Sequence, residues 1–586
     1  MPGPRSSRRR PLRIVVPSRN DPFLKQFTEL VGGPLGRHSA PGLVSPGFFT
    51  VERVLIILTT FAALLSVLVK TPCRLDGWAL PDYFYMGCYS DWPVLFETRG
   101  LADGVMPFVS AGSSFEYPVL LGLLAGATAW LVPGEGVSPG RALAYFDINA
   151  TLAAVAWLVT VLATARMSHR RPWDAAMVAL APAIVLAGTV NWDLWAAMLA
   201  ALAMLAFARH RPVWAGVFIG LGAALKLYPV LILGAILLLA IRTGRYRPLT
   251  ASAAAAAAVW LATNLPFMLR DFGSWFHFLD YSRQREAGYS SIWYAYNLTA
   301  QRQQLPVFSP EFINTASFLL FAAACAGIAV LALTAPRRPR MASLVFLVVA
   351  AFVLTNKVYS PQFVVWLVPL VALAHPRWRD FLIWQFFEVM HWWAIWMHLG
   401  QVTSGGEATR NLDAPYYVLA VLAHIAATVY IMAKVVRAIW LPEHDPVRRV
   451  DTDDPQGGEF DGAVDRFVLP VFDSVTLGSC RFSAKPGRFP AEPGRFSAEP
   501  GRFSAEPGRF SAEPGRFPAE PGHFPAGSGH RPAGRVESAD GEGGVAPEYS
   551  DTGIDPLRPS SRWPGIASGD TQGTRLNGQP EGEDES

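Results

Sequence analysis

The sequence predicts an all-α polytopic membrane protein with about 12 transmembrane helices. Its composition is the first reason: 51% of the 586 residues are hydrophobic and 16% are charged, with a mean hydropathy of +0.25. Long apolar runs between the charges are the second, because this pattern is typical of membrane-spanning helices. Basic clusters between the runs are the third, since they indicate orientation. The small net charge of +4 gives no indication of nucleic-acid binding, and no nucleic-acid partner is expected.

The N-terminal segment, residues 1–50, is rich in Arg, Pro and Gly and has no sustained apolar period. We expect it to be a disordered cytoplasmic leader. The first apolar run, Val54–Val69, resembles a signal peptide only in its hydrophobicity. Its leader is long, no small-residue cleavage site follows, and many further apolar runs come later. We therefore interpret this run as an uncleaved first transmembrane helix.

The apolar runs differ in length, so counting them does not settle the topology. A helical span needs about 20 residues. Several runs are shorter or broken. The runs lie at roughly 54–69, 117–132, 142–165, 175–190, 194–208, 213–225, 229–241, 249–267, 311–335, 341–355, 363–375, 381–399 and 415–436.

The basic clusters resolve the topology, because cytoplasmic connections carry an excess of Lys and Arg. They are "RMSHRR" (166–171), "RHR" (209–211), "RTGRYR" (242–247), "PRRPR" (336–340), "PRWR" (376–379) and the segment 434–449. With the N-terminus inside, every cluster is cytoplasmic on two conditions. The run 117–132 must lie at the outer interface without crossing, and the stretch 213–241 must break near Lys226–Pro229 into two short crossings. A membrane domain over 51–440 with both termini cytoplasmic follows.

Three long connections then face the outside, at 71–141, 268–310 and 400–414. Loops of this kind often carry function, so we expect the binding surface and the active site to be extracytoplasmic. Cys73 and Cys88 bracket fourteen residues of the first loop. If that loop faces an oxidising exterior they can form a disulfide, and two free thiols are an equally good interpretation of the spacing.

The C-terminal segment, residues 441–586, has a different character. Residues 481–529 repeat a seven-residue unit of the type "RFSAEPG". Pro and Gly in each unit exclude a continuous helix and hence a coiled coil. We expect a disordered cytoplasmic tail, in which the repeats are either inert low complexity or a multivalent docking motif.

Asp91 is the candidate catalytic residue. It stands in the first outer loop, at the start of the amphipathic segment "DWPVLFETRGL". Pro93 suits the first turn of a helix, so Asp91 is well placed as the N-cap. A capping carboxylate is also held in position, which makes the capping role compatible with that of a general base. Asp103, in the same loop, is interpreted as an ordinary loop acid.

Cations at the expected outer ends of the helices suggest a site for an anion. The chain has only six Lys, and Lys226 and Lys357 both lie where the positive-inside rule disfavours them. Arg283 and Arg285 alternate with aromatic residues in the second long loop, as in sites that recognise phosphate and sugar. Snorkelling lysines and an interfacial aromatic belt are the alternatives. No metal-binding or nucleotide-binding motif occurs.

Taken in order, these motifs resemble a known family. They are "YSDWPVLFETRGLADGVMPF" (89–108), "FEYPVLLGLL" (115–124), "NWD" (191–193), "KLYP" (226–229) and "YSPQFVVWLVP" (359–369). The series is similar to the GT-C membrane glycosyltransferases, and most to glycosyltransferase family 87. The resemblance implies a GT-C-like fold with interfacial helices in the first outer loop. It also implies an acidic catalytic motif, often Asp-x-Asp, whose second acid falls on Asp91. The first position is Tyr89, a departure from the pattern.

The resemblance implies a function as well: inverting transfer of a sugar, mannose being favoured, from a polyprenyl-phosphate donor to a cell-envelope glycolipid or glycan. Asp91 would be the general base, and Lys226, Lys357, Arg283 and Arg285 would stabilise the donor phosphate without a metal or other cofactor. The candidate substrate-binding residues are Glu116, Tyr117, Asn191, Asp193, Tyr228, Tyr359 and Gln362. The alternatives are a transporter or flippase for a lipid-linked or anionic substrate, and a scaffold that recruits partners through the repeats.

Overall fold

A computed structural model describes residues 14–32, 47–113, 115–404, 411–448 and 452–470. In this part of the chain the regular elements are all helical. Five helices are long and apolar enough to cross a membrane by length and composition. They are α3 (Val51–Val69), α8 (Pro139–Met167), α14 (Arg247–Arg270), α17 (Pro310–Thr334) and α21 (Ala414–Trp440). The predicted all-α membrane fold is confirmed.

Helices also cover the remaining predicted spans. They are α9 (Ala176–Ala179) and α10 (Pro182–Ala187), α11 (Asp193–Ala208), α12 (Pro212–Leu225), η3 (Tyr228–Leu231) with α13 (Ile232–Thr243), α18 (Met341–Thr355), η4 (Pro361–Phe363) with α19 (Val364–Ala374), and α20 (Trp378–Thr403). The stretch 213–241 is interrupted after Leu225 as expected, because Lys226 adopts an extended backbone before η3. Twelve crossings remain a prediction, since several of these helices are short.

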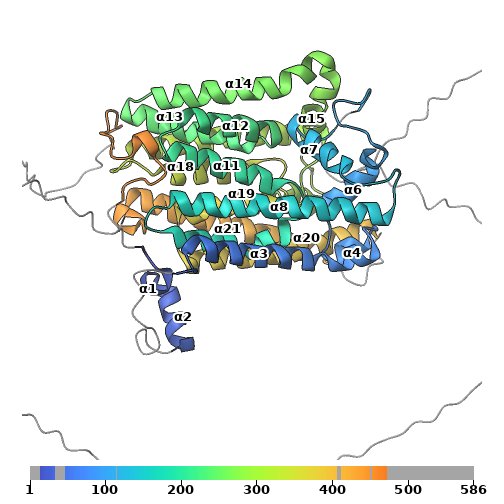
Figure 1. Cartoon of the computed structure of the whole chain (residues 1–586), viewed down its shortest axis with the longest axis horizontal. Helices are drawn as coiled ribbons and strands as arrows, with labels where there is room; N and C mark the ends of the chain where they lie inside the picture. Colours follow the sequence, from blue (N-terminus) through green and yellow to red (C-terminus); the bar gives the residue numbers. More distant parts are fainter. Residues whose placement is uncertain (1–13, 33–46, 114, 405–410, 449–451, 471–586) are drawn as a thin grey trace, which may run out of the picture. The chain divides into compact units, whose positions relative to one another are not determined.

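The predicted first and second loops contain short helices. The first has α4 (Thr71–Asp76), α5 (Asp82–Tyr85), α6 (Asp91–Thr98), η1 (Leu101–Asp103) and α7 (Val119–Trp130), and the second has α15 (Phe272–Gln284) and α16 (Ile292–Arg302). Figure 1 shows α4, α6, α7 and α15 together at one end of the long helices, which we call the Asp91 end. At 1.5 Å per residue, α7 is about 18 Å long, less than a bilayer core of about 30 Å. Since α13 and α19 are equally short, the length of α7 does not decide whether it crosses, and its place at the outer interface stays a prediction.

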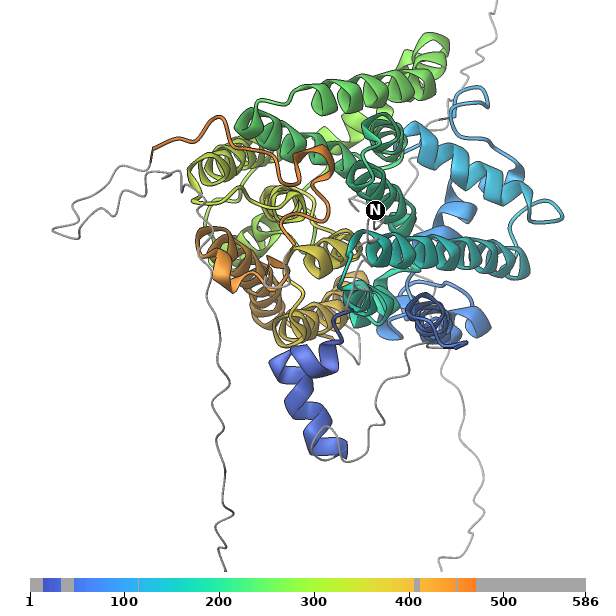
Figure 2. The ribbon, with the colours of Figure 1, turned by 60° about the vertical axis from the view of Figure 1, so that its left-hand side comes forward.

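The long helices pack side by side, as the end-on view in Figure 2 shows. Every residue of α19 is buried, which is expected of a helix that is apolar on all sides. The pair α12 and α14 approaches closely through glycines. A Cβ at Gly216 would lie 2.2 Å from the Ser252 carbonyl oxygen, and one at Gly220 would lie 2.6 Å from that of Ala256. Small residues therefore allow the close approach of α12 and α14, as is common between membrane helices.

The helix ends opposite the Asp91 end carry the arginine clusters, and we call this the arginine end. Arg171 donates to the carbonyl groups of Pro376 and Pro446, which joins three clusters. Arg340, almost fully buried, donates to Asp445 and to the Leu373 carbonyl. The clusters that were expected to lie on one side of the membrane thus meet at one end of the helices.

Parts of the two polar ends of the chain, which were expected to be disordered, are helical in the structure. In the leader 1–50, α1 (Pro17–Asn20) and α2 (Pro22–Gly32) are helical, and Val15 N donates to the Arg170 carbonyl at 2.8 Å. In the tail 441–586, η5 (Pro442–His444) and η7 (Gly458–Phe460) are ordered. The repeats at 481–529 and part of the loop 400–414 lie outside the described residues.

Residues 452–470 form what we call the clasp, which packs on the arginine end. Arg338 is buried and donates to Asp465 at 2.8 Å, and Arg242 donates to the other oxygen of Asp465 at 3.0 Å. Phe460 is fully buried, and its ring lies 5.6 Å from that of Phe207. A buried guanidinium needs acceptors, and these come from a polar segment that is far away in the sequence. The clasp is therefore part of the membrane domain.

We predict that the clasp, and not the chain after it, supports stability. A variant that ends at Pro470 is expected to unfold thermally at the same temperature as the full chain in detergent. A variant that ends at Arg448 is expected to unfold at a lower temperature, because Arg242 and Arg338 would be buried without their carboxylates. Removing one partner of a buried ion pair costs about 3–5 kcal/mol. Equal unfolding temperatures for the two truncations would contradict this role.

Candidate active site

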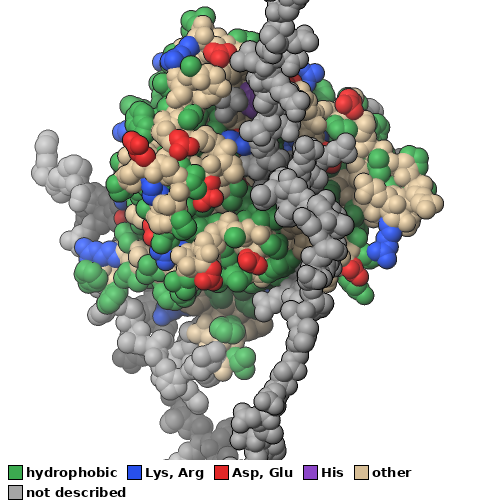
Figure 3. All heavy atoms as spheres, turned by 90° about the vertical axis from the view of Figure 1, so that its right-hand side faces the viewer, with side chains coloured by type: hydrophobic (Ala, Val, Ile, Leu, Met, Phe, Trp, Pro, Cys, Tyr) green, Lys and Arg blue, Asp and Glu red, His purple; other side chains and the backbone are tan. Residues whose placement is uncertain are grey.

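A cavity of about 460 Å³ lies at the Asp91 end. Its wall is built from the two long loops, the turns at 226–229 and 356–363, and the helices α17, α18 and α20. The polar residues of the wall include Tyr89, Asp91, Glu116, Tyr117, Lys226, Tyr228, Arg285, Lys357, Tyr359 and Gln362. Figure 3 shows the face of this end, on which acidic and basic side chains both occur. Segments far apart in the sequence thus contribute to one cavity.

Asp91 is the first residue of α6, but it does not cap this helix. The N-cap is Ser90, whose hydroxyl accepts a hydrogen bond from Trp92 N at 3.4 Å. The Asp91 backbone N–H donates instead to the Val190 carbonyl at 2.8 Å. The expected capping role of Asp91 is therefore wrong by one residue. Since Ser90 provides the cap, the Asp91 carboxylate is available to the cavity that it lines.

The Asp91 carboxylate is buried and receives hydrogen bonds on both oxygens. The Tyr89 hydroxyl donates to Oδ1 at 2.6 Å, and Asn191 Nδ2 donates to Oδ2. The Tyr117 hydroxyl lies 3.5 Å from Oδ2 and also accepts from Asn191 Nδ2 at 2.8 Å. These three donors come from both sides of the first loop and from the turn before α11, so they fix the direction in which the carboxylate points.

Burial raises the pKa of Asp91 to about 6, while the hydrogen bonds from Tyr89 and Asn191 and the Lys226 charge act in the opposite direction. The removal of a carboxylate from water disfavours its charged form, which explains the sign of the change. Asp91 is therefore ionised above about pH 6 and can accept a proton there. A carboxyl group with a raised pKa in a cavity is typical of sites of proton transfer.

Lys226 is held against the wall by a buried ion pair with Asp193. Its Nζ lies 3.3 Å from the Asp193 carboxylate and 5.0 Å from the centre of the Tyr117 ring. Trp366 Nε1 donates to the other side of this carboxylate at 2.8 Å. The N-cap residue of α11 is Trp192, so Asp193, the first residue of this helix, does not cap it. Asn191 and Asp193, which were predicted to bind substrate, are not among the residues that line the cavity; they contact Asp91 and Lys226, which do line it.

Lys357 and Arg285 form a second cationic part of the cavity. Lys357 is buried and donates to the Arg283 carbonyl at 3.0 Å. Burial, together with the charge of Arg285, lowers the pKa of Lys357 to about 8. The Arg283 side chain is exposed and does not line the cavity. Of the two arginines predicted to bind the donor phosphate, the structure therefore places only Arg285 in the cavity wall, because residues two apart at the end of a helix point in different directions.

The other predicted binding residues differ in their surroundings. Glu116 lines the cavity, but its carboxylate is paired with Arg99 at 3.0 Å. The Tyr228 ring stacks on Trp366 with 4.3 Å between centroids. The Tyr359 ring lies 4.8 Å from that of His424. Gln362 Oε1 accepts from the Ser360 hydroxyl at 2.7 Å. All four residues face the cavity, and two of them are aromatic, as is usual for sugar-binding surfaces.

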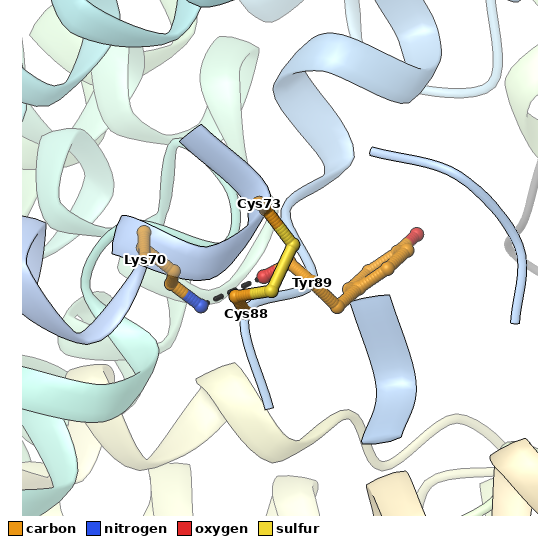
Figure 4. Close-up of a disulfide and its surroundings, with 4 residues drawn as sticks. All are labelled: Lys70, Cys73, Cys88 and Tyr89. Carbon is orange, nitrogen blue, oxygen red and sulfur yellow. Dashed lines mark hydrogen bonds between the residues drawn. A yellow bond between two sulfur atoms is a disulfide. The ribbon is translucent and has the colours of Figure 1, made fainter. Parts of the chain in front are cut away.

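The structure joins Cys73 and Cys88 in a disulfide, with 5.8 Å between the Cα atoms. Figure 4 shows this bond beside Lys70 and Tyr89. The disulfide connects α4 with the residue that immediately precedes Tyr89, and so ties the start of the first loop to the segment that carries Asp91.

Comparison with known families bears on this site. Residues 115–356 match the model of glycosyltransferase family 87. Over these residues, which make up less than half of the chain, the sequence is similar to this family. The recognition made from the sequence motifs is confirmed, and the protein is a membrane glycosyltransferase of the GT-C type. The matched region includes Tyr117, Lys226 and Arg285, whereas Asp91 precedes it.

Two further comparisons give less information about this site. The chain is similar to a crystal structure of ArnT from Cupriavidus metallidurans bound to undecaprenyl phosphate, with 16% sequence identity and a TM-score of 0.35. The similarity covers 67% of this chain and 74% of ArnT. No curated protein matches the sequence.

Two features of this site were missed in the sequence. Lys70 is fully buried near the cavity, at the end of α3. The sequence contains the signal for Lys70, because this residue is a third lysine at the expected outer end of a span. The apolar part of the wall, with Phe278, Leu279, Phe318 and Phe321, was not predicted. In a sequence so rich in apolar residues, nothing distinguishes a cavity wall from a lipid-facing surface.

Proposed function

We propose that this membrane glycosyltransferase transfers a sugar, mannose being favoured, from a polyprenyl-phosphate donor to a glycolipid or glycan of the cell envelope. The observation that carries the proposal is that Asp91 and three cations, Lys226, Arg285 and Lys357, line the same cavity. A base for the acceptor and cations for a phosphate leaving group are the two things that such a reaction requires.

In the proposed reaction, Asp91 accepts the proton of an acceptor hydroxyl, whose oxygen attacks the anomeric carbon of the donor sugar. The bond between this carbon and the phosphate oxygen breaks, and polyprenyl phosphate leaves with both bonding electrons. Attack opposite the leaving group inverts the configuration. Lys226, Arg285 and Lys357 neutralise the charge that develops on the phosphate.

The apolar wall of the cavity fits the lipid part of such a donor. Phe318, Phe321 and Leu279 line the cavity from α17 and α15. Phe318 is 70% exposed, and α17 is one of the helices able to cross a membrane. An isoprenoid chain can therefore leave the cavity between these helices and remain in contact with apolar side chains.

The orientation proposed from the charge pattern puts this cavity on the extracytoplasmic side and both termini in the cytoplasm. The arginine clusters meet at the opposite end from the cavity, which supports this assignment. The disulfide between Cys73 and Cys88 also suits an oxidising exterior.

Asp91→Asn is expected to reduce transfer by about a hundredfold or more, because a carboxamide does not accept the hydroxyl proton. The assay uses membranes, polyprenyl-phosphate mannose labelled in the sugar, and equal amounts of inserted protein. Asp103→Asn is the matched control, since Asp103 lies in the same loop but is exposed and outside the cavity. Normal transfer by the Asp91 variant would exclude Asp91 as the base.

The transfer rate is expected to depend on pH with two limbs. It rises as pH increases through about 6, where the Asp91 carboxylate forms, and falls through about 8, where Lys357 loses its charge. Lys357→Arg is expected to move the falling limb to higher pH, because a guanidinium keeps its charge up to about pH 12. A falling limb that stays in place in this variant would show that another group causes it.

Arg285→Gln and Lys357→Met are each expected to lower kcat/KM for the donor about tenfold or more, since each removes a cation from the cavity. Arg283→Gln is the control. It removes the same charge two residues away, from an exposed side chain outside the cavity. A loss in the Arg283 variant equal to that in the Arg285 variant would indicate that only the general charge of the loop matters.

A further inference from the structure

Lys70 is a fully buried cation whose role is not explained by the reaction above. Its ammonium group does not line the cavity; it donates to the Tyr89 backbone carbonyl at 2.7 Å and lies 5.0 Å from the centre of the Trp392 ring. Figure 4 shows this hydrogen bond next to the disulfide. A buried cation is costly unless its position is used. Its partner here is the residue whose hydroxyl binds Asp91.

The segment from Cys88 to Asp91 is fixed at every residue. Cys88 is bonded covalently to Cys73, and the Tyr89 carbonyl is held by Lys70. The Ser90 hydroxyl donates to the Thr189 carbonyl at 2.9 Å, and Asp91 N donates to the Val190 carbonyl at 2.8 Å. A loop with one contact at each residue loses little further freedom when a substrate binds.

The Tyr89 ring is enclosed on its sides by other aromatic rings. Its centroid lies 5.0 Å from that of Trp396, 5.4 Å from that of Phe84 and 5.1 Å from that of Tyr83. Lys70 fixes the backbone end of this residue, and the rings fix its plane. The hydroxyl is then directed to Asp91 Oδ1, where it donates at 2.6 Å.

We propose that Lys70 and Tyr89 are positioning residues for the transfer reaction: Lys70 fixes the Tyr89 backbone, and the Tyr89 hydroxyl fixes the Asp91 carboxylate. The Cys73–Cys88 disulfide holds the same backbone at Cys88, the residue before Tyr89. The inference rests on the proposed function, in which Asp91 is the base. It adds that the angle at which Asp91 meets the acceptor hydroxyl is set from the end of α3, by a lysine that does not line the cavity.

The arrangement also favours the ionised form of Asp91. The Tyr89 hydrogen bond lowers the pKa of this carboxyl against the effect of burial. The other titratable or charged groups around Asp91 are Tyr83, Tyr117, Lys70, Lys226 and Asp193. Removing the Tyr89 hydroxyl is therefore expected to raise the pKa of Asp91, and to move the rising limb of the pH–rate profile to higher pH.

The test compares Tyr89→Phe, Lys70→Met and Tyr85→Phe in the transfer assay with polyprenyl-phosphate mannose. Tyr85→Phe is the matched control, because the Tyr85 hydroxyl donates to the Gly400 carbonyl at 3.0 Å and not to Asp91. We expect kcat to fall about tenfold or more in Tyr89→Phe and in Lys70→Met, the loss for a hydrogen bond to a charged group. In Tyr89→Phe the rising limb of the pH–rate profile should shift to higher pH. For Lys70→Met the donor KM should not change.

A purely structural role would give a different result: less folded protein in the membrane, with an unshifted pH profile and an unchanged kcat per folded molecule. That result, or a profile of Tyr89→Phe equal to that of Tyr85→Phe, would overturn the inference. If Lys70→Met does not insert into the membrane, the result for Tyr89→Phe alone decides whether the inference stands.

Asp91→Asn separates this inference from the proposed function. If the wild-type protein transfers no sugar in this assay, the proposed function fails. If Asp91→Asn is fully active, Asp91 is not the base, and the positioning role fails with it. If Asp91→Asn is inactive while Tyr89→Phe behaves like the control, only the positioning role fails.

Discussion

Charges buried among apolar helices have to be paired or hydrogen-bonded, and both ends of this protein are organised around that requirement. At the Asp91 end, Asp193 is bound by Lys226 and Trp366. At the arginine end, the Arg242 and Arg338 guanidinium groups are bound by Asp465. In each case the partners come from segments distant in sequence. The pairing of buried charge therefore determines which loops and which part of the tail belong to the folded domain.

How far the sequence predicts this structure depends on whether a feature is local. The helices follow from apolar runs, and the interruption after Leu225 follows from the Pro229 that comes soon after it. The packing of the clasp does not follow, because its residues have no apolar period and its order depends on arginines more than a hundred residues away. The same distinction applies within the site. Lys226 and Lys357 were predicted from their unusual position in the chain, but the side of the helix end on which Arg283 falls is set by tertiary packing.

Tyr89 shows how one departure from a family pattern changes the chemistry around the base. A second carboxylate at this position would stand next to Asp91 and repel it, unless a cation bound both. A phenol donates a hydrogen bond instead, and it stabilises the ionised form of Asp91. The single charge then needs fewer cations nearby. In the proposed reaction, Lys226, Arg285 and Lys357, which line the same cavity, then neutralise the phosphate of the donor.

The position of Asp91 in the chain explains why its support is so extensive. Asp91 precedes the region 115–356 that matches family 87, whereas its partners Tyr117, Val190 and Asn191 lie within that region. The carboxylate and the cations therefore come from separate parts of the chain, and the proposed reaction requires these parts to be held in a fixed position relative to each other. A displacement of about 1 Å is enough to reduce a rate about a hundredfold. On this short segment a disulfide, a buried lysine and hydrogen bonds to the carbonyl groups of Thr189 and Val190 hold the backbone to such a small tolerance.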